Sequence, residues 1–187
     1  MRSGSRVAAG IALAMATSVP AAAQSGQPAP AFTAPVISDT GSLHGPRQPI
    51  FFRHDVHAGQ NRVPCLYCHY SAAISSEPGI PSVQTCAGCH MMVGGSTPTY
   101  QAEIKKVRDA WNHKAPPQWV RIHALPGFVH FPHLRHIKAL GSESCTTCHG
   151  DVGHMVQVYQ VAPLTMGWCI SCHLQKQVTR DCLVCHY

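Results

Sequence analysis

All ten cysteines of this 187-residue chain lie in five copies of one short pattern, Cys-x-x-Cys-His. The pattern suits covalent attachment of haem c, because two thiols can add to the two vinyl groups of one porphyrin while the next imidazole binds the iron. The predicted attachment residues are Cys65 and Cys68, Cys86 and Cys89, Cys145 and Cys148, Cys169 and Cys172, and Cys182 and Cys185, followed by the predicted proximal ligands His69, His90, His149, His173 and His186.

Two other uses of a Cys-x-x-Cys pair fit this chain less well. A structural zinc site needs two such pairs brought together and leaves the five adjacent histidines unexplained. A thioredoxin-type redox pair needs a βαβ context, which the sequence does not indicate. Five copies that use every cysteine also leave none for a disulfide framework. The sequence therefore predicts five covalently bound haem c groups.

Nine further histidines are available for the distal side of five irons. The pattern Phe-x-His-x-x-His occurs at 52–57 and again at 131–136, each time eight or nine residues before a haem motif. Two histidines three positions apart lie about one helical turn apart, so neighbouring haems can take one each. The predicted distal ligands from this repeat are His54, His57, His133 and His136.

The fifth distal ligand is less well marked by the pattern. His123 lies in an apolar segment that leads into the second repeat, and we expect it to fill this position. Met155 and Met166 are the alternatives, and a methionine would raise the potential of its haem. The remaining four histidines stand outside any repeat and are predicted not to bind iron: His44, His113, His130 and His154.

The number of histidines bears on the kind of activity. An electron carrier closes both axial positions of each iron, whereas a catalytic haem leaves one open. No Cys-x-x-Cys-Lys variant occurs, and nine spare histidines are enough to close five irons. We therefore expect an electron-transfer protein and no catalytic residues. A free cytochrome c7-like shuttle and a haem-based reductase of small oxyanions are the alternatives.

The N-terminus carries the features of a secretory signal peptide. Arg2 and Arg6 precede an uncharged apolar stretch at 7–19, and Ala21–Ala23 supplies small residues for cleavage. That stretch is shorter than the ~20 residues of a spanning helix, so the segment 1–23 is predicted to be cleaved, with retention as an anchor the alternative. The mature protein is expected on the periplasmic side of the cytoplasmic membrane.

Cleavage lowers the formal net charge from +6 to +4, because it removes two arginines and no acid. The remaining basic residues are scattered, and haem propionates would more than cancel them, so we expect no nucleic-acid partner.

The segments outside the haem motifs are short and offer few residues for a hydrophobic core. Residues 24–49 are rich in Pro, Gly, Ser and Ala and predict an extended arm. We expect a first haem module at 50–118 with two haems and a second at 119–187 with three. Apolar residues at helical spacing after Thr97-Pro98 predict a helix at 99–112, and we expect its charged face to be solvated: Glu103, Lys105, Lys106 and Asp109. The chain after residue 23 offers about 33 residues per haem, which is too few for a core made of polypeptide alone. The predicted fold class is therefore a multihaem cytochrome c: mostly coil, with short α-helices around the porphyrins and little or no β-sheet.

Several longer motifs carry a resemblance to a known family. They are Trp-Val-Arg-x-His-x-Leu-Pro at 119–126, the Phe-x-His-x-x-His run at 131–136, Gly150–Met155, Val158–Gln160, Pro163–Cys169 and the closing segment Asp181–Tyr187. Together they resemble the pentahaem cytochrome subunit of alternative complex III, over roughly residues 47–187.

The resemblance implies a place in a membrane-bound quinol-oxidising complex. Its partners would be a molybdopterin-oxidoreductase-like iron–sulfur subunit and polytopic quinol-binding membrane subunits. Electrons would pass to a c-type cytochrome or terminal oxidase, and membrane association would come through the partners.

Overall fold

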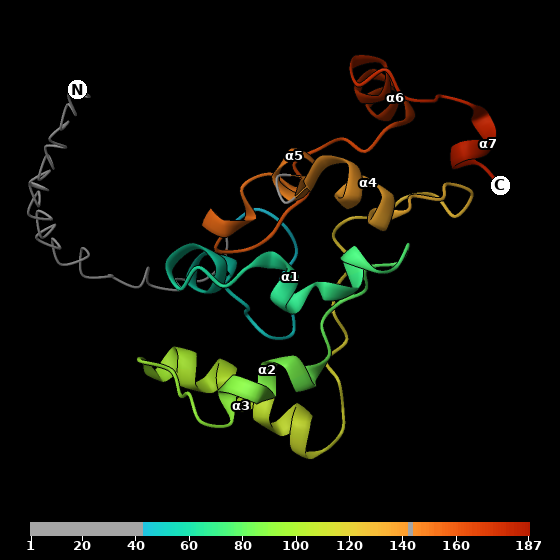
Figure 1. Ribbon diagram of the computed structural model, residues 1–187. Coiled ribbons are helices and arrows are strands. Elements are labelled where there is room, and N and C mark those ends of the chain that lie inside the picture. The colour runs from blue at the N-terminus through green and yellow to red at the C-terminus, as the bar shows by residue number, and fades with distance from the viewer. Residues whose placement is uncertain (1–42, 142–143) are drawn as a thin grey trace, which may run out of the picture. The chain divides into compact units, whose positions relative to one another are not determined.

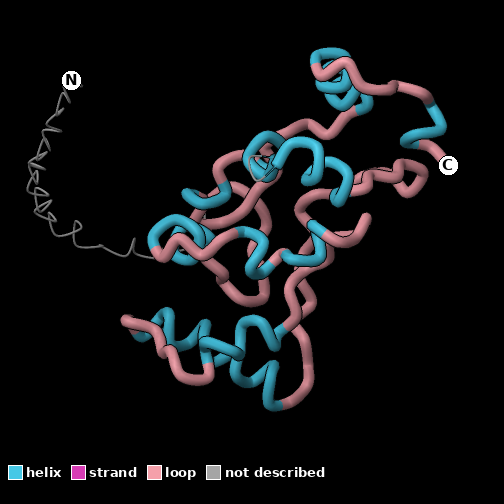
Figure 2. Tube along the Cα trace, viewed as in Figure 1, coloured by secondary structure: helices cyan, strands magenta, loops and turns pink. Residues whose placement is uncertain are grey.

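The computed structural model describes residues 43–141 and 144–187. This part consists of helices and loops and contains no strand (Figures 1 and 2), in agreement with the predicted fold class. All of it belongs to the unit Ile37–Tyr187, and the other unit, Met1–Val36, lies outside the described residues. The predicted signal peptide and most of the predicted arm lie outside them too.

Each Cys-x-x-Cys-His motif lies on or at the end of a short helix. One helical turn brings the two cysteines, three positions apart, to the same face and presents the histidine just beyond them. The five motif helices are α1 (Cys65–Cys68), α2 (Val83–His90), α5 (Ser144–His149), α6 (Met166–Gln175) and α7 (Cys182–Cys185).

The two Phe-x-His-x-x-His repeats begin two further helices. The first runs into the π-helix η1 (Asp55–Gln60), and the second into α4 (His133–Leu140). Two 3₁₀ turns, η2 (Tyr70–Ala73) and η4 (Val152–His154), follow motif helices α1 and α5. η1 packs against η4, and α4 packs against η2. These contacts connect residues of the two predicted haem modules, whose division at residue 118 stays a prediction.

The longest helix is α3 (Pro98–Asn112), which confirms the helix predicted at 99–112. The Thr97 side chain accepts a hydrogen bond from the Tyr100 amide at 3.3 Å and so caps the first turn, with proline in the first helical position. Val107 is buried on the apolar face, and α3 packs against α2, as Figure 1 shows.

The charged face of α3 was expected to be solvated, and for Glu103 this expectation is wrong. Its carboxylate accepts a hydrogen bond from the Phe51 amide at 2.8 Å and pairs with Lys106, and the side chain is only 17% exposed. Lys105 and Asp109 form an exposed pair, as expected. Glu103 therefore ties the chain just before the first repeat to α3.

The last residues of the predicted arm are held by the chain itself. The Gln48 amide donates to the Val120 carbonyl and accepts from the Val120 amide, both at 2.9 Å. Gln157 donates to the carbonyls of His44 and Gly45. The arm therefore contacts residues more than 70 positions away at its described end.

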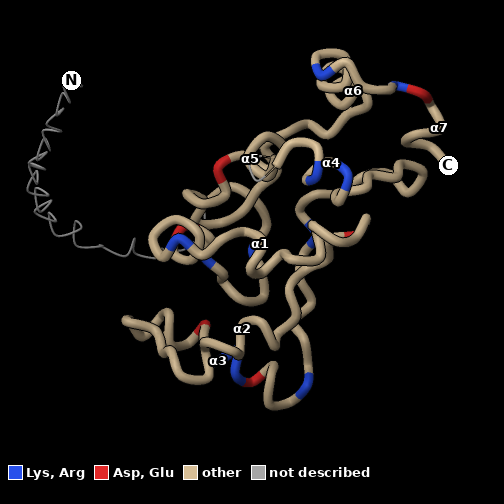
Figure 3. The backbone as a smooth tube through the Cα atoms, viewed as in Figure 1, with Lys and Arg blue, Asp and Glu red and all other residues tan. Residues whose placement is uncertain are grey.

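Apolar side chains build little core in the described part of the chain. The buried apolar residues there are Ile50, Ala72, Ala87, Val107, Met155 and Ala162, and no large side chain is fully buried. Charged residues are spread along several elements (Figure 3). Within the described residues, every helix falls short of the length and apolarity that crossing a bilayer requires. Packing of the polypeptide alone thus leaves most apolar residues partly exposed.

Candidate haem sites

Two pairs of histidine rings face each other in the first half of the chain. The rings of His54 and His69 lie 6.4 Å apart between centroids, with an angle of 10° between their planes. The rings of His57 and His90 lie 5.9 Å apart at 69°. Each pair joins one predicted distal ligand to one predicted proximal ligand.

The second half of the chain forms two more pairs of the same kind. His133 and His149 lie 6.5 Å apart at 16°, and His136 and His173 lie 6.2 Å apart at 40°. The four predicted distal histidines of the repeat thus each face a different motif histidine. Because α4 carries both His133 and His136, one helix reaches the third and the fourth motif.

The spacing within the pairs fits a metal ion between two imidazoles. At the ~2.0 Å typical of metal–imidazole bonds, the ring centroids are expected roughly 6 Å apart. Each pair offers two nitrogen ligands, as an iron whose other four positions are filled by a porphyrin requires. Among the residues described, no group of three or more His, Cys, Asp or Glu side chains gathers as a metal cage would. The residues present therefore fit haem.

Hydrogen bonds fix several of these rings with one nitrogen free. A Nδ1–H that donates to a backbone carbonyl leaves the Nε2 lone pair for iron, sets the tautomer and orients the ring. The Nδ1–carbonyl contacts are His57 to Arg53 at 2.8 Å, His90 to Val93 at 3.2 Å, His136 to Pro132 at 3.1 Å, His173 to Thr179 at 2.7 Å and His186 to Phe128 at 3.0 Å.

Burial favours the neutral imidazole at most of the paired rings. Desolvation, with smaller effects of nearby histidines, lowers the pKa of His54 and of His149 to about 4. Burial also lowers the pKa of His57, His69 and His133. Neutral imidazole is the form that binds a metal ion, so these rings are ready to bind at neutral pH.

The cysteines do not resemble those of a redox-thiol site. All ten are free thiols in the structure. Reactive cysteines have a lowered pKa in electropositive surroundings, but here burial raises the pKa of five of them. These are Cys68, Cys86, Cys145, Cys148 and Cys169.

Contacts between cysteines give the order of the motifs in space. Cys65 of the first motif is a neighbour that helps to raise the pKa of Cys145 in the third motif, although the two cysteines are 80 positions apart in the sequence. Electrostatic interactions join Cys68 to Cys89, Cys148 to Cys169 and Cys172, and Cys169 to Cys185. The motifs therefore follow one another in the order second, first, third, fourth, fifth.

The sequence did not mark the residues that support the first repeat. The Arg53 side chain is 3% exposed, and it forms an ion pair with Asp55 and donates to the Tyr100 hydroxyl at 2.8 Å. Its carbonyl accepts from His57. In the sequence, only the position of Arg53 and Asp55 on either side of His54 could have indicated this supporting role.

The predicted fifth distal ligand lies beside the third motif. His123 Nε2 is 3.3 Å from His149 Nδ1, and the two rings are perpendicular. Among the ring contacts of residues 43–141 and 144–187, His186 lies against Phe128 and not against a second imidazole. Met155 is buried beside Gly150, and Met166 is exposed at the start of α6. The distal ligand of the fifth motif is therefore still a matter of prediction.

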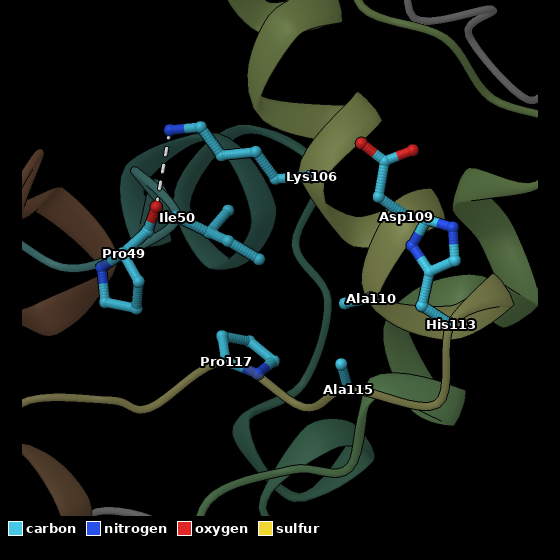
Figure 4. Close-up of a pocket in the computed structure, with 8 residues that line it drawn as sticks. All are labelled: Pro49, Ile50, Lys106, Asp109, Ala110, His113, Ala115 and Pro117. Atoms are coloured by element: carbon cyan, nitrogen blue, oxygen red, sulfur yellow. Dashed lines mark hydrogen bonds between the residues drawn. The ribbon is translucent and has the colours of Figure 1, made fainter.

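A separate shallow cavity of about 320 Å³ lies beside α3 (Figure 4). Lys106 reaches across it to the Pro49 carbonyl at 3.3 Å, and His113 lines its far side. None of the motif cysteines or predicted iron ligands lines it. The four histidine pairs are thus the stronger candidate for function.

Comparison with known proteins also supports haem binding. No family model matches the chain. It is 29% identical, over 163 residues, to the multihaem cytochrome c subunit of menaquinone reductase from Nitratidesulfovibrio vulgaris (strain Hildenborough). The match covers 74% of this chain and 76% of that subunit. With its five motifs and four histidine pairs, the chain is thus similar to a multihaem c-type cytochrome.

Proposed function

We propose that this protein is an electron-transfer cytochrome that carries five covalent haem c groups and works as a subunit of a membrane-bound quinone oxidoreductase. The observation that carries the proposal is the set of four facing histidine pairs, each made of one motif histidine and one repeat histidine. The similarity to a menaquinone reductase subunit supports the link to quinone.

The residues of the chain would do three things. The ten cysteines would hold the porphyrins, and each histidine pair would supply two nitrogen ligands to one iron. Bound haem supplies one-electron redox chemistry. Burial and the Nδ1 hydrogen bonds of the rings would keep these ligands in one orientation. With two imidazoles at each of the four pairs, no position is left there for a substrate.

The proposed complex is a quinol-oxidising one of the alternative complex III type. The motifs at 119–126, 131–136 and 150–169 support this assignment. Its partners would be a molybdopterin-oxidoreductase-like iron–sulfur subunit and polytopic quinol-binding subunits, with a c-type cytochrome or oxidase as acceptor. The segment 1–23 would direct the chain to the periplasmic side of the membrane, where the partners hold it.

The similarity to a menaquinone reductase favours a second candidate, in which electrons flow through the protein toward quinone. The two candidates predict opposite behaviour in native membranes. In the first, menaquinol added under anaerobic conditions reduces the cytochrome. In the second, the reduced cytochrome is reoxidised by added menaquinone.

The test is made on the complex purified from native membranes. The intact mass of the denatured subunit should show five haem additions on a chain that begins after Ala23. Reduction by menaquinol, followed at the cytochrome absorption bands, should then be complete. Fewer than five haems would contradict the stoichiometry, and a purified cytochrome without membrane subunits would favour the free shuttle.

A further inference from the structure

His123 is the histidine whose position least fits its predicted role. A distal ligand would have to face a motif histidine across an iron, as the four pairs do at 5.9 to 6.5 Å. The ring of His123 instead lies 4.4 Å from that of His149, at 80° to it. An iron bound by both rings from opposite sides does not fit this arrangement, because it would hold the two ligand nitrogens about 4 Å apart.

The nitrogen atoms of His123 and His149 that meet indicate a hydrogen bond between the two rings. In the proposed function His149 binds iron through Nε2, so its Nδ1 carries the hydrogen. The His123 Nε2, 3.3 Å from that Nδ1, is then the acceptor. This occupies the nitrogen that His123 would otherwise offer to an iron.

The acceptor differs in kind from those at three of the other motif histidines. His90, His173 and His186 all donate Nδ1–H to backbone carbonyls. An imidazole nitrogen is a more basic acceptor than an amide oxygen, so it withdraws the proton further and leaves more electron density on the donor ring. A ligand with more electron density stabilises the oxidised iron and lowers its reduction potential.

We propose that His123 is a positioning residue: it accepts a hydrogen bond from His149, orients that ligand, and lowers the reduction potential of the third haem relative to a backbone acceptor. The proposal rests on the proposed function, because it requires His149 to be an iron ligand. It also leaves the fifth iron to a ligand other than His123.

The test compares His123→Phe and His123→Gln with the unmutated protein, each purified with its haems and checked by intact mass. Phe removes the acceptor, and Gln retains a weaker one in its amide oxygen. The expected result for His123→Phe is a positive shift of one midpoint potential in an EPR-monitored redox titration. A roughly tenfold change in the reduction equilibrium corresponds to about 59 mV for one electron. His123→Gln should shift the same haem by less.

His154→Ala is the matched control, because His154 is an exposed histidine that contacts only Asp151 among the interactions described for its side chain. It should leave all five potentials unchanged. A new high-spin haem that binds carbon monoxide in His123→Phe would show that His123 is a ligand and would overturn the proposal. Unchanged potentials in both His123 variants would overturn it too. Failure of the proposed function would show separately, as missing haem or high-spin iron at His149 in the unmutated protein.

Discussion

The segments 52–57 and 131–136 build nearly the same structure on different supports. In both, a phenylalanine stacks on the second histidine at 26° and meets the first edge-on, at 83° for Phe52 and 85° for Phe131. In both, the second histidine donates to the carbonyl four positions before it. The first histidine has a buried Nδ1 without a hydrogen-bond partner in each case.

The supports differ. The first segment leads into a π-helix and is held by the buried Arg53, whereas the second leads into an α-helix and has Pro132 in the corresponding position. The shared geometry therefore comes from the spacing of Phe and His, and the helix type is secondary. The second segment also has a third histidine, His123, beside its motif histidine, which the first segment lacks.

The largest effect is expected from removing a pair of attachment cysteines. Cys65→Ser with Cys68→Ser in one variant, and Cys145→Ser with Cys148→Ser in another, should each lower the haem count by one. Because the described residues bury few apolar side chains, we expect the porphyrins to supply much of the core, so both variants should also unfold at lower temperature. Intact mass and thermal unfolding measure the two effects. A variant that keeps five haems would break the equivalence of the two segments.

Removing the first histidine of each repeat comes next. His54→Ala and His133→Ala should each open one iron, giving one high-spin haem per protein that binds carbon monoxide on reduction. Carbon monoxide titration measures the stoichiometry, with His44→Ala as the control that binds none. If only one of the two variants binds carbon monoxide, the segments are not functional equivalents.

Substitution of Arg53 should destabilise the protein more than substitution of Pro132, the corresponding residue of the second segment. Arg53→Met keeps the volume but leaves Asp55 without its ion-pair partner in a site where Asp55 is only 13% exposed. Breaking such a buried pair costs about 3 kcal/mol, whereas Pro132→Ala should cost less than about 1 kcal/mol. Thermal unfolding of the haem-loaded variants measures both. Equal losses would mean that the ion pair does not support the first segment.

The smallest effect is expected at the phenylalanines. Phe52→Leu and Phe131→Leu retain apolar volume and lose the ring stacking on the histidines, which is worth about 1 kcal/mol. Both variants should lose stability by similar amounts and keep every haem low-spin. A high-spin haem in either variant would show that the ring is needed to position its ligand.

The local features of the fold could be predicted from the sequence. Helix α3 follows from its cap, its proline and its apolar spacing, and the absence of strands in the described residues follows from the motif density. The sequence could not reveal Glu103 as a partner of the Phe51 amide, because a charged helix face looks solvated until a distant backbone group is placed against it.

The candidate site could be predicted from the sequence only where a local pattern marked its residues. The repeat identified His54, His57, His133 and His136, and each faces a motif histidine in the structure. Their role as iron ligands is still a prediction. His123 stood alone in the sequence, so nothing local distinguished an iron ligand from a neighbour of one. Only the placement of His149 against it shows the contact.

The most direct test of the account is the axial ligation of the unmutated, haem-loaded protein. Low-temperature EPR together with near-infrared magnetic circular dichroism reports the ligand pair of each low-spin iron. The four histidine pairs predict bis-histidine ligation at four haems and no carbon monoxide binding at any of them after reduction. Two or more high-spin haems, or histidine–methionine ligation at two or more of the five, would contradict the pairing of these histidines across iron.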